Sequence, residues 1–150
     1  MTRVMTPIVK EKLWGVTRPV DISPTHELHH ATIKAGGFSS QHCHHRKFNG
    51  FYVVSGTLLV HFYRRKGDAT PYDTGRAEAG SSVIAVWDEW HRFEAVTDVE
   101  LIEWYFNDHV DPTDIERYDE GGLTPPSEDA TQPCPTSSTS PSKPSKSPSS

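Results

Sequence analysis

The stretch Gly36–Gly56, GGFSSQHCHHRKFNGFYVVSG, decides the fold of this chain because it joins a histidine cluster to a strand and a turn. Three of the nine histidines lie here, in HCHH at 42–45. If Ser40–Arg46 is a β-strand, alternate side chains share a face, so His42 and His44 point to one side and His45 to the other. The pattern therefore predicts two imidazoles that can bind one ion.

Two further donors can reach the same ion. Asn49 precedes the next predicted strand and offers an amide oxygen, while His91, within SSVIAVWDEWHRFEAV at 81–96, begins a later strand. Three imidazoles from two separate segments suit one divalent transition metal with open positions, and these ligands do not distinguish Zn, Fe, Mn and Ni. The alternative without a metal stays open, because H-x-H matches are common: HCHH would then be a solvated strand edge and His91 an ordinary half-buried histidine.

The residues between Glu27 and Phe106 predict an all-β domain. Their apolar runs are short, rich in β-branched and aromatic residues, and separated by Gly, Asp, Pro and Ser. One short helix is expected near the C-terminus in DPTDIERYDE at 111–120, where Asp111 can cap the first turn and Pro112 suits its first position. The predicted strands are Leu28–Lys34, Ser40–Arg46, Gly50–Val54, Thr57–Arg64, Ser82–Val86, His91–Val96 and Val99–Phe106.

Composition changes abruptly after Leu123. Of the 27 residues in 124–150, 20 are Pro, Ser or Thr, and this segment has no Leu, Ile, Val or aromatic residue. Such a sequence cannot bury enough apolar surface to offset its chain entropy. We therefore expect one folded domain in residues 1–123 and a disordered tail in residues 124–150.

Charge and hydropathy narrow the classes of partner. The net charge is −5 and the first 123 residues contain no basic stripe, so we expect no nucleic-acid partner. No apolar stretch approaches the roughly 18–20 residues of a membrane span, and the N-terminal residues lack the apolar core of a secretory signal. We therefore expect a cytoplasmic protein that does not enter membranes, and its two cysteines do not form a disulfide framework.

The spacings of two motifs resemble those of the cupin superfamily. The first cupin motif, G-x5-H-x-H-x4-E-x6-G, is matched in spacing from Gly36 to Gly56, with Asn49 in place of Glu. The second, G-x5-P-x-G-x2-H-x3-N, is matched in spacing from Gly80 to Ala95. Six motif positions keep their residue and four depart, namely Asn49, Val86, Asp88 and Ala95. The resemblance covers roughly residues 10–120 and implies a jelly-roll β-barrel.

Within the superfamily, the chain looks like the small cupin domain of type II mannose-6-phosphate isomerases and mannose-1-phosphate guanylyltransferases. The segments that carry this similarity include KLWG at 12–15, DEWHRFE at 88–94 and LIEWYFNDHVDPTDIERYDE at 101–120. It implies a small polar ligand such as a sugar or sugar phosphate. One fold hosts unrelated chemistries, so ancestry alone does not give the activity.

The departure at Asn49 bears most on function. An amide supplies a neutral oxygen and cannot act as a base at pH 7, which weakens an isomerase interpretation. A three-histidine site without the carboxylate is similar to that of the Fe(II) cupin dioxygenases. A non-catalytic ligand-binding or assembly module is the third hypothesis, so whether the protein is an enzyme stays open.

The resemblance also implies where a ligand would bind. The metal is expected on His42, His44 and His91, with Asn49 as a weak fourth ligand. Arg46 shares the strand parity of His42 and His44 and is expected at the pocket rim. The expected apolar wall consists of Phe51, Val53 and Val86. A homodimer is compatible with these features.

Overall fold

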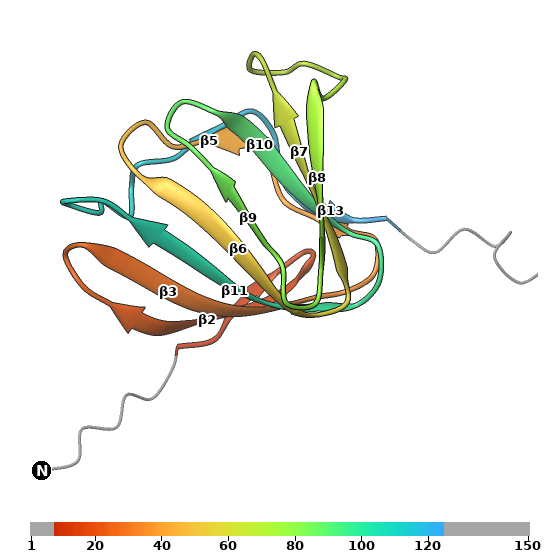
Figure 1. Ribbon diagram of the computed structural model, residues 1–150, viewed down its shortest axis with the longest axis horizontal. Helices are drawn as coiled ribbons and strands as arrows, with labels where there is room; N and C mark the ends of the chain where they lie inside the picture. Colours follow the sequence, from red (N-terminus) through yellow and green to blue (C-terminus); the bar gives the residue numbers. More distant parts are fainter. Residues whose placement is uncertain (1–7, 125–150) are drawn as a thin grey trace, which may run out of the picture.

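A computed structural model describes residues 8–124 of the chain. The predicted disordered tail therefore lies, apart from Thr124, outside the described residues. All strand pairings within them are antiparallel, and they form two sheets that face each other and converge where β6 and β7 are joined (Figure 1). The predicted all-β architecture is confirmed.

The first sheet has six strands in the order β1-β2-β3-β11-β6-β9. Along its centre, β11 pairs with β3 over eight residues without a shift, and with β6 over seven residues with one register shift between Glu100 and Leu101. The strands are β1 (Lys10–Lys12), β2 (Gly15–Ile22), β3 (His26–Ile33), β6 (Phe48–Ser55), β9 (Ser82–Ala85) and β11 (Val99–Phe106).

The second sheet is built around β10 (Trp90–Ala95). One edge of β10 pairs with β7 (Thr57–Tyr63), which in turn pairs with β8 (Asp73–Glu78). The other edge pairs with two very short strands, β4 (Gly37–Phe38) and β5 (His42–Cys43). Two C-terminal pieces complete the sheet, β12 (Glu116–Arg117) against β5 and β13 (Gly122–Leu123) against β4.

The hydrophobic core fills one end of the space between the sheets. It is formed by inward side chains that alternate along each strand with outward ones, as the pleat of a strand requires. Its buried members are Ala31, Ile33, Phe51, Val53, Leu58, Val60, Phe62, Ala77, Ala85, Phe93, Ala95, Val99 and Leu101, with Trp14 and Val83 packed against them.

The same inward positions become polar toward the other end. Along β11 the inward side chains run from Val99 and Leu101 to Glu103 and Tyr105. On β3 the apolar Ala31 gives way to His29 and Glu27, on β10 Phe93 gives way to His91, and on β6 Phe51 gives way to Asn49. This polar end of the barrel therefore carries the candidate functional site.

The predicted helix over residues 111–120 is wrong. The segment contains a turn at 112–113 followed by β12, and residues 8–124 contain no helix. The Asp111 carboxylate accepts from the Thr113 amide, as a helix cap would, but the chain does not continue as a helix. Asp114 accepts from the amides of His45 and Arg46 through its carboxylate, and Glu116 pairs with Cys43. Contacts with β5 and the residues after it override the local cap signals.

The predicted strand Ser40–Arg46 is only two residues long, as β5. Residues 44–47 bend away instead of continuing the strand. Two longer strands were not predicted, β2 and β8. β2 contains Pro19, which lies where its register with β3 shifts, and β8 has the sequence DTGRAE, whose composition does not favour strands.

Candidate metal centre

The structure brings His42, His44 and His91 together. One ring nitrogen from each lies within 4.8 Å of the others, and all three side chains are buried. His42 and His91 are direct partners in the pairing of β5 with β10, with ring centroids 4.4 Å apart. His44 follows β5 and faces the same point, with its ring centroid 5.1 Å from that of His42. The predicted parity of the histidine cluster thus holds for its inward members.

Each of the three imidazoles has one nitrogen bound to a backbone carbonyl. The Nδ1 atoms of His42, His44 and His91 lie 2.7, 2.7 and 2.8 Å from the carbonyl oxygens of Ser40, Asp114 and Glu89. A carbonyl oxygen only accepts, so each Nδ1 carries the proton and donates. The neutral rings therefore present unprotonated Nε2 atoms, which is the tautomer that a metal-binding histidine needs.

Burial keeps these rings neutral. It lowers the pKa of His44 to about 3 and that of His91 to about 4. Burial also lowers the pKa of His42 well below its usual value, and the nearby His91 and His44 lower it further. Near pH 7 none of the three carries a charge, so their Nε2 lone pairs are available to bind a cation.

Two of the Nε2 atoms lack the partner that a lone pair requires. His44 Nε2 is buried and no described residue donates a hydrogen bond to it. His91 Nε2 lies 3.0 Å from Asn49 Oδ1, which is also an acceptor. Exchanging the oxygen and nitrogen of the Asn49 amide would remove two hydrogen bonds, because its Nδ2 donates to Glu103 Oε1 at 3.2 Å and to the Trp104 carbonyl at 3.4 Å. Lone pairs that face one another without a proton between them are stabilised by a cation. The imidazole nitrogens and the Asn49 oxygen are therefore suitable ligands for a divalent metal.

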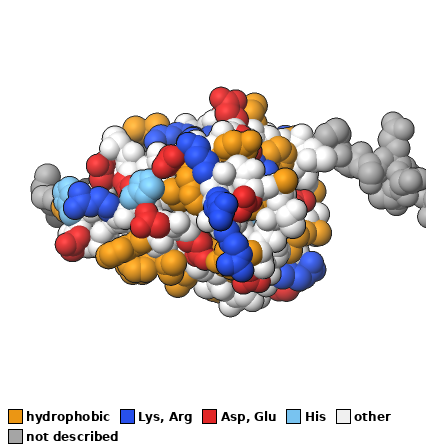
Figure 2. Space-filling view, turned by 90° about the horizontal axis from the view of Figure 1, so that it is seen from above, with side chains coloured by type: hydrophobic (Ala, Val, Ile, Leu, Met, Phe, Trp, Pro, Cys, Tyr) orange, Lys and Arg blue, Asp and Glu red, His pale blue; other side chains and the backbone are white. Residues whose placement is uncertain are grey.

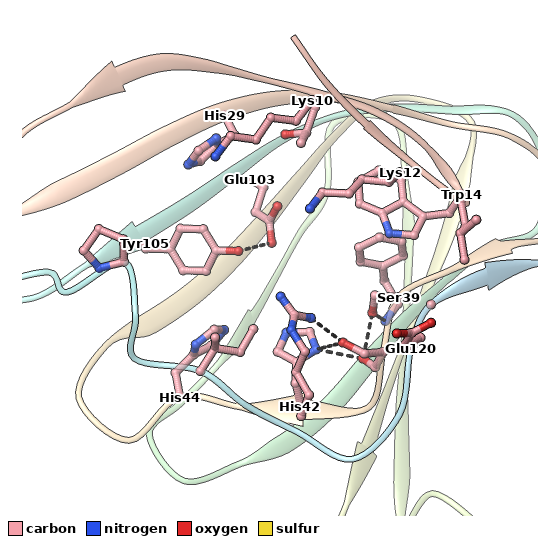
Figure 3. A pocket seen from close by; sticks show the side chains of 18 of the residues that line it. Lys10, Lys12, Trp14, His29, Ser39, His42, His44, Glu103, Tyr105 and Glu120 are labelled. Atoms are coloured by element: carbon pink, nitrogen blue, oxygen red, sulfur yellow. Dashed lines mark hydrogen bonds between the residues drawn. The ribbon is translucent and has the colours of Figure 1, made fainter. Parts of the chain in front are cut away.

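A cavity of about 800 Å³ opens above this group. Figure 3 shows His42 and His44 on one side of it and Glu103 and Tyr105 on the opposite side. Its lining carries charges of both signs: the cations are Lys10, Lys12, Lys47 and Arg117, and the carboxylates are Glu11, Glu27, Glu103 and Glu120. The volume lies within the range of small-molecule sites.

Glu103 is the pocket carboxylate that contacts the histidine group through Asn49. Its Oε1 accepts from the Tyr105 hydroxyl at 2.7 Å and from Asn49 Nδ2 at 3.2 Å. Burial raises the pKa of Tyr105 well above its usual value, so the phenol stays protonated and continues to donate. Asn49 thus contacts both the histidine group and the carboxylate. Sequence reasoning missed Glu103 and Tyr105, although both have the same strand parity as the apolar Leu101.

Four residues predicted to line the pocket lie elsewhere. Arg46 is exposed, because the chain bends after β5 and strand parity no longer applies, and the buried Lys47 lines the cavity instead. Phe51 and Val53 are in the core, one and two steps along β6 beyond Asn49. Val86 is exposed beyond the end of β9.

Lys47 is a buried cation beside the site. Its side chain is only 3% exposed, with Nζ donating to the Asp111 carbonyl at 2.9 Å and lying 4.6 Å from the centroid of the Tyr105 ring. Burial lowers the pKa of Lys47 from its usual value. The C-terminal segment therefore helps to position both Lys47 and His44, which bind carbonyls of Asp111 and Asp114.

His45 lies on the outer side, as predicted. Its ring contacts Asp88 at 2.6 Å and Glu116 at 3.1 Å, and these two carboxylates raise its pKa. Cys43, His45 and Glu116 form a second group of possible ligands, but Glu116 already binds Lys66 at 2.7 Å, and burial raises the pKa of the Cys43 thiol to about 11. We describe this group as an ion-pair cluster that joins β5 to β12.

Several known proteins have a fold similar to that of this chain. No protein-family model matches the sequence, and no curated protein matches it. Among solved structures, KdgF from Halomonas sp. has a TM-score of 0.57 and 18% identity, with 66% of this chain and 86% of that one covered. Oxalate decarboxylase from Bacillus subtilis has a TM-score of 0.61 and 15% identity, with 74% and 30% covered. CapF from Staphylococcus aureus, a capsular polysaccharide assembling protein, has a TM-score of 0.59 and 21% identity, with 76% and 32% covered.

The chain has the cupin fold. All three similar structures are cupin-family proteins, and at these identities the likeness concerns the fold alone. The chain spans about a third of the length of CapF and oxalate decarboxylase, so those proteins contain parts with no counterpart in it. The predicted jelly-roll fold of the cupins is confirmed, whereas the narrower resemblance to mannose-6-phosphate isomerases is not confirmed.

Surface charge and hydropathy bear on the expected partners. The face in Figure 2 mixes Lys and Arg with Asp, Glu and hydrophobic side chains. Within residues 8–124 there is no helix long and apolar enough to cross a membrane. The expectations of no nucleic-acid partner and of a cytoplasmic location stay predictions.

The lowered histidine pKa values predict how stability depends on pH. In the metal-free protein, His42, His44 and His91 are protonated more readily when unfolded than when folded. The free energy of unfolding should therefore fall as pH decreases from about 6.5 toward 4, by at most about 1.4 kcal/mol per pH unit and per histidine. Urea unfolding of metal-stripped protein at a series of pH values measures this slope.

Two variants separate the buried histidines from other titrating groups. His44→Gln should flatten the dependence between pH 6.5 and 4. His45→Gln is the control, because the pKa of His45 is raised and its removal cannot flatten that slope. An equal slope in wild type and His44→Gln would show that His44 is not held neutral by burial.

Proposed function

We propose that this chain is a metal-binding cupin that holds one divalent transition metal on His42, His44 and His91. The observation that carries the proposal is the set of three Nδ1–carbonyl hydrogen bonds, which leaves three unprotonated Nε2 atoms facing one point. The partnerless Nε2 of His44 supports it further. Imidazole ligands suit Zn, Fe, Mn or Ni, and Asn49 Oδ1 adds a neutral fourth ligand.

The ligand of the site is a small polar molecule, and a sugar or sugar phosphate is the class that we propose. The cavity can enclose a molecule of that size, and its lining combines carboxylate, hydroxyl, imidazole and ammonium groups. Lys10 and Lys12 of β1 line the cavity with Lys47 and Arg117, beside four glutamates, so the lining offers individual cations to an anionic group of the ligand. Glu103 and His29 can accept or donate hydrogen bonds to hydroxyl groups.

Glu103 supplies the base that Asn49 cannot. When bound, the metal would act as a Lewis acid that polarises a carbonyl or hydroxyl oxygen of the ligand. Glu103 lies across the cavity from His42 and His44, and its Oε1 is fixed by Tyr105 and Asn49. No described residue donates a hydrogen bond to its Oε2, so this oxygen can take a proton from a bound molecule. The arrangement supports an enzyme that moves a proton, as a sugar-phosphate isomerase does.

Metal content tests the histidine site. Protein purified without a histidine tag should bind one divalent ion per chain, and His44→Ala or His91→Ala should abolish stoichiometric binding. His45→Ala is the matched control from the same HCHH sequence and should keep the ion, because His45 faces Asp88 and Glu116. Asn49→Glu should tighten binding by adding a negative charge. Equal loss of metal in the His44 and His45 variants would contradict the proposed ligands.

Proton exchange tests the proposed chemistry. Metal-loaded protein incubated in D₂O with mannose 6-phosphate or fructose 6-phosphate should exchange the proton next to the carbonyl carbon, as NMR detects. Glu103→Gln should slow this exchange by about 10²–10⁴-fold while keeping the metal. The control Glu120→Gln changes an exposed carboxylate at the rim of the cavity and should have a much smaller effect. Absence of exchange in protein loaded with Zn, Fe, Mn or Ni in turn would exclude these substrates. An exchange rate in Glu103→Gln equal to that of wild type would exclude Glu103 as the base.

A further inference from the structure

The outer face of the six-stranded sheet is apolar over three of its strands. A sheet with one face on the core normally exposes polar side chains on the other. On β6, β9 and β11, however, most outward positions are aliphatic or aromatic. We define the outer apolar patch as Phe48, Tyr52, Val54, Ile84, Val86, Trp87, Ile102, Trp104 and Phe106.

The strand register makes this patch continuous. Gly50 pairs with Ile84 of β9 on one side and Trp104 of β11 on the other. A Cβ on Gly50 would lie only 2.2 Å from the Trp104 ring, so the indole of β11 occupies the space above this glycine of β6. In the next row Tyr52 pairs with Ile102. The central strand β6 is therefore covered by apolar groups that reach both of its neighbours.

An aromatic cluster extends the patch toward the end of the sheet. Phe48 stacks on Phe106 with ring centroids 4.7 Å apart and planes 11° apart, and its centroid lies 5.2 Å from that of Trp87. Even so, Trp87 and Phe106 are 48% and 39% exposed. Large aromatic groups that pack together and still face solvent are typical of protein interfaces.

Polar residues border the patch on the β3 side. His30 of β3 contacts Glu100 of β11 at 2.8 Å, and Arg18 of β2 pairs with His30 in the next strand. The patch itself contains no charged residue, whereas the bordering residues carry both signs. An apolar centre with a polar rim is the usual arrangement of a protein–protein interface.

The exposed area approaches what a stable dimer needs. Six members of the patch, namely Tyr52, Val54, Ile84, Val86, Trp87 and Phe106, are 39–49% exposed. With roughly 150–250 Å² per aromatic side chain and somewhat less per aliphatic one, they present on the order of 500 Å² to solvent. Each partner of a standard interface contributes about 800 Å², which the remaining members and the rim can complete.

We infer that the outer apolar patch is the interface of a homodimer. A second copy is the occupant that matches it, because an apolar patch without charges, rimmed by both signs, is complementary to itself across a two-fold axis. The pocket lies on the inner face of the same sheet, so association through the outer face leaves its lining unchanged. This inference does not depend on the proposed metal or substrate.

The mass of the full-length chain in solution tests the inference. Light scattering after size-exclusion chromatography should give twice the chain mass for wild type. Ile84→Lys and, independently, Tyr52→Lys should give monomers with unchanged circular dichroism. Leu123→Lys is the matched control: Leu123 is 44% exposed, similar to Ile84, but lies on β13 of the other sheet, so this variant should stay dimeric.

Two outcomes would overturn the inference. One is a dimer that both patch variants leave intact. The other is a monomeric wild type; if this monomer associates only after residues 125–150 are removed, the chain's own C-terminal segment covers the patch.

Discussion

Strand alternation is the constraint on which this molecule depends. Each strand must send every second side chain into the space between the sheets, and those side chains decide what that space becomes. Where β3, β6, β10 and β11 supply Ala31, Phe51, Phe93 and Leu101, the space is a core. One or two steps further along the same strands, the inward residues are polar and the space is a pocket. The core thus holds the histidines, Asn49 and Glu103 at positions that the pairing of the sheets fixes.

Burial gives the site its chemical character. An imidazole removed from water loses the hydration of its charged form, so its pKa falls and it stays neutral. The backbone carbonyls of Ser40, Glu89 and Asp114 then select one tautomer in each ring. Because Asp114 belongs to the C-terminal segment, the site is complete only when that segment packs against β5. The contacts of Asp114 and Glu116 with β5 and the residues after it take the place of the hydrogen bonds that a helix would make.

The sequence predicts some parts of the site well because they depend on short-range geometry. The convergence of His42, His44 and His91 was predicted, because strand parity relates His42 to His44 and motif spacing adds His91. The same reasoning failed for Arg46, since the strand ends at Cys43 and the chain turns before reaching it. Glu103 and Tyr105 were missed, yet their signal is present: they continue the inward parity of Val99 and Leu101. An acidic residue two positions after a buried leucine in the same strand, and so on the same face, is a pattern that can be searched for in other sequences.

Most of the fold was also predictable, and the missing parts have physical reasons. Strands with alternating or continuous apolar residues, such as Val99–Phe106, were predicted with the observed bounds. β2, β8 and the pieces β12 and β13 were not: β2 is interrupted by Pro19, and the other three have sequences with little strand propensity that are held by pairing with other strands. Long-range pairing of this kind leaves little trace in the sequence of the segment itself.

The convergence of the three Nε2 atoms is the central claim, and anomalous diffraction from crystals grown with Zn²⁺ or Mn²⁺ tests it most directly. The account predicts one strong peak per chain, about 2.0–2.2 Å from Nε2 of His42, His44 and His91, with all three Nδ1 atoms still bound to their carbonyls. A peak bound through Nδ1, or one at Cys43, His45 and Glu116 with none at the three histidines, would contradict it.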